Sequence, residues 1–146
     1  MIRLAASPRE AAPPQVFALW TDLLARLSLA AVASTQAQTR LQLRALGVRR
    51  TGTVATNLAR ELSMAYGMAA SAGVWVQPLE LQRRVGELAH PGALVCHLRG
   101  LATAYRHIML DPAMPPDGPL AKWLAERQRV HLVQLECTEQ IADRSR

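Results

Sequence analysis

The chain contains few aromatic residues, few cysteines and almost no lysine. Aromatic residues make up 4% of its 146 residues, and lysine occurs only at Lys122. So few aromatic rings leave little surface for stacking on bases, which argues against sequence-specific reading of a nucleic acid. Two cysteines cannot form the disulfide framework of a small secreted domain. Cys96 and Cys137 lie in apolar helical patterns and are predicted to be buried thiols, with a single disulfide between them as the alternative.

Long apolar runs and a targeting signal are also missing. The longest apolar segment, residues 23–33, is interrupted by Arg26 and Ser28 and falls short of the ~20 residues that a membrane-spanning helix needs. Residues 1–15 lack the continuous apolar stretch of a signal peptide. We therefore expect a cytoplasmic protein without a membrane partner, in which residues 1–13 form a disordered lead-in.

Metal-binding and nucleophile motifs are absent from the sequence. Cys96 and His97 are adjacent, and adjacent side chains on a helix point about 100° apart, which does not suit a shared metal ion. The segment AYRHI, residues 104–108, would suit acid–base chemistry or base stacking only if Tyr105 and His107 faced one polar pocket, whereas consecutive side chains fan around a helix. No metal and no cofactor is expected.

The carboxylates are spaced for salt bridges and not for catalysis. Glu80 lies three and four residues before Arg83 and Arg84, and Glu126 lies three before Arg129. No pair of carboxylates suited to glycoside hydrolysis is recognisable. We therefore expect a protein that is not an enzyme.

Apolar residues, which make up half of the chain, recur at spacings of three and four with little of the alternation that strands show. This pattern predicts an all-α, single-domain bundle of about five helices over residues 14–142, followed by a tail at 143–146. The expected helices cover residues 14–46, a second segment that starts at Thr51 or Thr53 as its cap and stops at Gly73, and residues 78–89, 93–110 and 120–142. The four prolines of residues 111–119 predict an ordered surface loop or a hinge there.

The first predicted helix is long for so small a domain. If residues 14–46 were continuous, the helix would measure on the order of 50 Å at ~1.5 Å per residue. A kink at residues 34–36, with the sequence STQ, is the alternative. Gly47 is expected to end the helix as its C-terminal cap.

The excess positive charge is confined to one part of the chain. Residues 1–60 hold eight arginines against Glu10 and Asp22, and the remaining residues hold nine cations against nine carboxylates, so the formal net charge of +6 belongs to the first part. Residues 40–60, RLQLRALGVRRTGTVATNLAR, contain five arginines and no carboxylate. Ion pairs for these arginines would have to come from the later helices.

Helical spacing places part of this charge on one side. Gln36, Arg40 and Arg44 are four residues apart and project together, while residues 37, 41 and 45 form a neighbouring apolar stripe. Arg49 and Arg50 extend the polar row into the turn. Arginine forks bind phosphates and release counterions from nucleic acids, and the free N–H groups at the start of a helix near Thr51 and Thr53 attract an anion as well. The predicted nucleic-acid-binding residues are Arg40, Arg44, Arg49, Arg50, Thr51, Thr53 and Arg60.

Two other interpretations of the arginines remain open. They could form a solvated face in an arginine-rich protein, or contact a protein or a lipid. The TG dipeptide does not make a Walker motif, because the Gly-Lys-Ser/Thr ending is missing, so nucleotide hydrolysis is not implied. In the connector GVWV, Trp75 either closes the core or, if exposed, serves as an interface for another subunit.

A small, basic, all-helical chain with the arginines of RLQLRALGVRR and NLAR on one face resembles the helical small subunits of CRISPR effector ribonucleoproteins of antiviral defence. The resemblance lies in size, helix content and charge distribution. It implies a non-catalytic subunit that binds RNA or single-stranded DNA through the backbone, without sequence preference, and that contacts other subunits and further copies of itself. Contacts between subunits would fall to Trp75 or the proline-rich loop. RNA and DNA are not distinguished.

The alternative function is a helical protein-interaction or ligand-binding module, such as a regulator domain or a granule-coating protein. In that case the leucine- and alanine-rich face of the first helix would stay partly exposed to a partner, and the arginines would only increase solubility.

Overall fold

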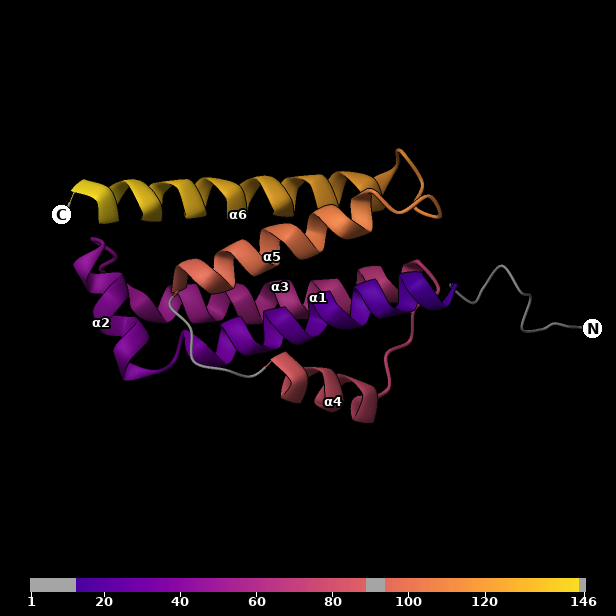
Figure 1. Ribbon diagram of the computed structural model, residues 1–146, viewed down its shortest axis with the longest axis horizontal. Coiled ribbons are helices and arrows are strands. Elements are labelled where there is room, and N and C mark those ends of the chain that lie inside the picture. Colours follow the sequence, from indigo (N-terminus) through magenta and orange to yellow (C-terminus); the bar gives the residue numbers. More distant parts are fainter. Residues whose placement is uncertain (1–12, 89–93, 145–146) are drawn as a thin grey trace, which may run out of the picture.

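The computed structural model describes residues 13–88 and 94–144, and within them it is entirely helical, with no strand (Figure 1). The predicted all-α fold is confirmed. The six helices of the described part are α1 (Pro14–Ala33), α2 (Ala37–Ala45), α3 (Thr51–Ser71), α4 (Pro78–Leu88), α5 (Leu94–Met109) and α6 (Pro119–Arg144). The expected number was about five, and the additional helix arises because the first predicted helix is divided into α1 and α2. Residues 1–12 of the predicted lead-in (1–13) and the last two residues of the predicted tail lie outside the described residues, whereas Asp143 and Arg144 belong to α6.

The division falls at the STQ segment where a kink was the alternative. Ser34 and Thr35 donate their hydroxyl hydrogens to the carbonyl oxygens of Ala30 and Val32, both at 2.7 Å. Such local bonds compete with the helical ladder. Gln36 then adopts an extended conformation, with φ −75° and ψ 146°, which redirects the chain into α2.

Glycine ends two of the helices in the way that the sequence indicates. Gly47 follows α2 with φ 89°, and the N–H of Val48 donates to Leu43 O at 2.9 Å. Gly73 follows α3 with φ 79°, and the N–H of Val74 donates to Ala69 O at 2.8 Å. Both ends are Schellman motifs, in which a residue without Cβ occupies the left-handed region.

Helix α1 is the centre of the bundle, and α3, α4 and α5 pack on it while α6 packs on α5 (Figure 1). The core forms around the apolar stripe of α1, where Trp20, Leu23 and Leu24 are completely buried. By length and composition α1 would also pass for a membrane-spanning helix, with a mean hydropathy of 1.6 in its most apolar window. Leu23, Leu24 and Leu27 of this helix are completely buried in the bundle, as is common in a core helix. The absence of a membrane partner stays a prediction.

Two local predictions are wrong. Cys96 and Cys137 are exposed free thiols and not buried ones, because the buried faces of their helices run through residues such as Leu101 and Leu124. Helix α3 begins at Thr51, and no side chain caps it, so neither Thr51 nor Thr53 acts as the cap. Thr51 lies inside the first turn with its side chain buried.

Candidate nucleic-acid interface and an adjoining cleft

The five arginines of residues 40–60 are all exposed, and none pairs with a carboxylate in the part of the chain that the structure describes. Six of the described acidic residues bind other arginines. These pairs are Arg26 and Arg84 with Asp22, Arg83 with Glu80 and Glu87, Arg84 with Glu87, Arg99 with Glu139, and Arg127 with Glu61 and Glu126. The pair of Glu80 with Arg83 agrees with the sequence prediction, whereas Glu126 pairs with Arg127 and not with Arg129. The positive charge of residues 40–60 is therefore left uncompensated among the described side chains.

Helix α2 presents the first of these arginines. The neighbouring apolar stripe of Ala37, Leu41 and Ala45 is not a packing face, since all three residues are exposed and Leu41 is 64% exposed. Helix α2 packs mainly on α3, and its side with Leu43 is buried. This leaves Arg40 and Arg44 beside Leu41 on a solvent-facing side.

We call Arg40, Arg44, Arg49 and Arg50 the arginine surface. Arg40 and Arg44 lie one turn apart on α2, and Arg49 and Arg50 lie in the turn that leads to α3. Of the two threonines predicted to join them, Thr53 is exposed and Thr51 is buried, so the hydroxyl of Thr51 is not available to a large ligand. The N–H of Thr53 already donates to Arg50 O at 3.1 Å.

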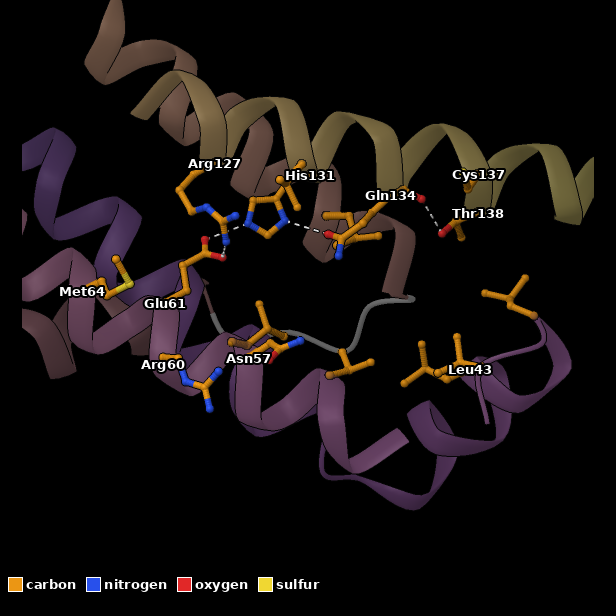
Figure 2. Close-up of a pocket in the computed structure, with 16 residues that line it drawn as sticks. Leu43, Asn57, Arg60, Glu61, Met64, Arg127, His131, Gln134, Cys137 and Thr138 are labelled. Carbon is orange, nitrogen blue, oxygen red and sulfur yellow. Dashed lines mark hydrogen bonds and ion pairs between the residues drawn. The ribbon is translucent and has the colours of Figure 1, made fainter. Parts of the chain in front are cut away.

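Arg60 belongs to a different feature, a cleft of about 580 Å³ between the α2–α3 segment and the α5–α6 pair (Figure 2). Its walls are mainly apolar. They are lined by Leu43, Leu46, Val48, Val54, Asn57, Leu58, Arg60, Glu61, Met64, Leu98, Arg127, Val130, His131, Gln134, Cys137 and Thr138. The cleft lies where α3 and α6 do not pack closely on each other, since α3 packs on α1 and α6 packs on α5 (Figure 1).

A buried carboxylate closes one end of the cleft. Glu61 on α3 is 5% exposed, and its Oε2 accepts hydrogen bonds from the Tyr105 hydroxyl and from His131 Nε2, both at 2.7 Å. Its Oε1 accepts from Arg127 at 3.0 Å. On the other side of the His131 ring, Nδ1 lies 3.0 Å from Gln134 Oε1. Every oxygen of the carboxylate therefore has a partner, as a buried charge requires (Figure 2).

These partners set the ionisation of the site. Burial by itself would raise the pKa of Glu61, but the hydrogen bond and charge interaction with His131, helped by Tyr105 and Arg127, outweigh it and hold the pKa below its ordinary value. Burial and the neighbouring carboxylate raise the pKa of Tyr105. The carboxylate is thus ionised and the phenol neutral across the ordinary pH range, which makes the cluster a fixed tie between α3, α5 and α6.

Glu61 was not among the functional residues predicted from the sequence. A signal was available, because Glu61 lies between Leu58 and Ala65 at spacings of three and four on the inward face of α3. A carboxylate on an apolar face requires cationic or donor partners. The identity of those partners, 44 to 70 residues away, is not contained in any local pattern.

Tyr105 and His107 do not share a pocket. Tyr105 is completely buried and points to Glu61, whereas His107 is exposed on the other side of α5, near Asp22 and Arg26. Within the described residues no group of three histidine, cysteine or acidic side chains could hold a metal ion.

Trp75 is 69% exposed in the connector between α3 and α4, so it does not close the core. Val74, at 2% exposure, fills that place. The interface role therefore remains for Trp75.

Comparisons with models of protein families, with curated proteins and with solved structures found no match for the chain. A fold class alone does not define a function. The features that bear on function are the arginine surface and the cleft.

Proposed function

We propose that the chain binds the phosphate backbone of RNA or single-stranded DNA through the arginine surface, without reading the sequence. It would act as a non-catalytic subunit of a larger cytoplasmic ribonucleoprotein, in the manner of the CRISPR small subunits that it resembles. The observation that carries the proposal is that all four guanidinium groups are exposed and unpaired with any described carboxylate.

Two physical arguments favour a nucleic acid over a solvated face. Exposed arginines gain little from isolated surface ion pairs, but a polyanion repeats its charge and so engages several of them at once. Each phosphate that an arginine neutralises also releases condensed counterions. Leu41 lies between Arg40 and Arg44 in the sequence and adds an exposed apolar contact on the same helix.

The alternative interaction module loses one of its supports. Its expected partner surface was the leucine- and alanine-rich face of the first predicted helix, of which Leu41 is exposed but Leu23, Leu24 and Leu27 are completely buried. A partner could not reach them without opening the bundle.

Salt dependence of binding tests the proposal directly. With a labelled 30-nucleotide single strand, four phosphate contacts predict that log K falls against log salt with a slope of roughly −3, since each contact on a single strand contributes about −0.7. The double variant Arg40→Gln/Arg44→Gln should reduce the magnitude of the slope by about 1.4 and weaken binding roughly 5- to 30-fold at low salt. Fluorescence anisotropy with an RNA and a DNA of the same sequence measures both effects.

A matched control removes the same charge elsewhere. Arg106 and Arg129 are exposed on α5 and α6 and form no ion pair with described residues, so Arg106→Gln/Arg129→Gln has the same net charge as the test variant. The control should keep the slope of the wild-type protein. Equal losses in the two variants would mean that net charge and not the arginine surface drives binding, and the proposal would be wrong.

A further inference from the structure

The cleft between α3 and α6 has the dimensions of a small-molecule site. Its volume of about 580 Å³ lies within the range of about 300–1,000 Å³ in which proteins bind small ligands. Leucine and valine side chains from α2, the turn after it, α3, α5 and α6 form much of the apolar wall, so an apolar group would be sheltered from water inside it (Figure 2).

The charge of the lining is one-sided. The only carboxylate among the lining residues is Glu61, and both of its oxygens already accept hydrogen bonds from described residues. Arg127 is paired with Glu61, which leaves Arg60 as the lining cation without a described partner. A cationic ligand would find no open carboxylate there, whereas an anion would find one open guanidinium.

Polar side chains accompany Arg60 at the rim. Asn57 lies three residues earlier on α3, carries an amide donor on the same side of the helix, and also lines the cleft. A single planar guanidinium fork with an amide beside it suits the two oxygens of one carboxylate. The apolar wall between Val54 and Leu43 would then receive the rest of the molecule.

From these features we propose that the cleft binds a monocarboxylate with an apolar tail. The carboxylate is held at the rim by Arg60 and Asn57, and the tail lies against the leucines and valines of α2, α3 and α6. This site is separate from the arginine surface, and it does not depend on binding of a nucleic acid. No chemical change of the ligand is part of the proposal.

The two exposed cysteines provide a test with an internal control. Cys137 lines the cleft, whereas Cys96 lies on the opposite side of α5 near Asp22. Decanoate, used below its micelle concentration, should slow the alkylation of Cys137 by N-ethylmaleimide and leave the rate at Cys96 unchanged. At a ligand concentration tenfold above Kd, the rate at Cys137 should fall about tenfold, because only about one molecule in eleven remains free. Mass spectrometry of the peptides from the full chain gives both rates.

Related ligands and variants test whether the carboxylate is recognised and whether Arg60 binds it. Decanol and decylammonium have the same tail without the anionic group, and each should protect Cys137 much less than decanoate does. Arg60→Gln should weaken protection by decanoate about tenfold, as expected for one charge-assisted contact, whereas Arg40→Gln/Arg44→Gln should keep it. All of these substitutions are at exposed positions, so the fold should tolerate them.

Three results would overturn the proposal. Equal slowing at Cys96 and Cys137 would show that decanoate does not occupy the cleft. Equal protection by decanol or decylammonium would show that the anionic group is not recognised. Unchanged protection in Arg60→Gln would remove the assigned anchor. None of these results bears on the salt dependence of nucleic-acid binding.

Discussion

At the scale of single residues, Glu61 is the side chain on which most long-range polar contacts converge. It joins Tyr105 of α5 and Arg127 and His131 of α6 to α3, where close packing of α3 and α6 is missing. Removing one member of such a cluster leaves the others buried without a partner. The resulting loss in the free energy of unfolding is larger than the net stabilisation that one hydrogen-bonded pair provides.

Glu61→Gln should therefore lower the free energy of unfolding by about 2–3 kcal/mol at neutral pH. The exposed Glu126→Gln is a matched control, because Glu126 contacts Arg127 only at 3.7 Å, and its effect should stay within about 0.5 kcal/mol. Urea unfolding of the three proteins measures the difference. Similar values for the two variants would show that the Glu61 cluster does not tie the helices together.

The same comparison has a defined pH dependence. The pKa of Glu61 is lower in the folded state than the ordinary value of 4.5, so its ionised form stabilises the fold. This stabilisation is complete above the unfolded-state pKa and is lost as the pH falls below 4.5 toward the folded-state pKa. The gap between wild type and Glu61→Gln should thus shrink as the pH falls below about 4.5. A gap that widens in that pH range would contradict the assignment.

At the scale of elements, α2 and α3 end in the same motif but differ in how strongly they are held. Gly47 and Gly73 both have positive φ, a conformation that costs an alanine roughly 1–2 kcal/mol. The residue after Gly73, Val74, is buried in the core, whereas α2 packs mainly on α3 and makes few contacts with it. The two glycines thus allow the contribution of each helix to be separated.

Gly73→Ala should lower the global free energy of unfolding by about 1 kcal/mol, because strain at this position acts on the core. Gly47→Ala should instead loosen α2 alone, with faster amide exchange at residues 40–46 and little change in the global value. Urea unfolding together with hydrogen exchange distinguishes the two effects. A global loss in Gly47→Ala equal to that in Gly73→Ala would mean that α2 is integral to the bundle.

At the scale of the whole molecule, the exposed apolar residue that stands out is Trp75. The sequence predicts an interface with another subunit or copy if this side chain is exposed, and the structure gives an exposed fraction of 69%. A large exposed aromatic is a typical anchor in protein interfaces. Leu79, at the start of α4, is 78% exposed as well.

Trp75→Ala should leave the free energy of unfolding unchanged within about 0.5 kcal/mol, since the side chain contributes little to the core. Cooperative binding of several copies to a long single strand should weaken, which sedimentation velocity at increasing protein-to-DNA ratios measures. Leu110→Ala, at a position of 67% exposure between α5 and α6, is the control and should keep cooperativity. If Trp75→Ala binds as cooperatively as the control, Trp75 is not a contact between copies.

The sequence by itself determined the helical class, most helix boundaries, the glycine stops and the confinement of excess charge to residues 1–60. These properties depend on neighbours within a few positions, such as the three- and four-residue spacing around Leu23 or the lack of Cβ in Gly47. The tertiary structure decided which face of each helix meets another. It exposed Leu41, Cys137 and Trp75, buried Thr51, and placed Arg60 at the cleft and apart from the other predicted nucleic-acid-binding arginines. It also brought Glu61 together with Tyr105, Arg127 and His131. The partners of this buried charge lie on helices distant in sequence, so the local spacing of residues does not predict them.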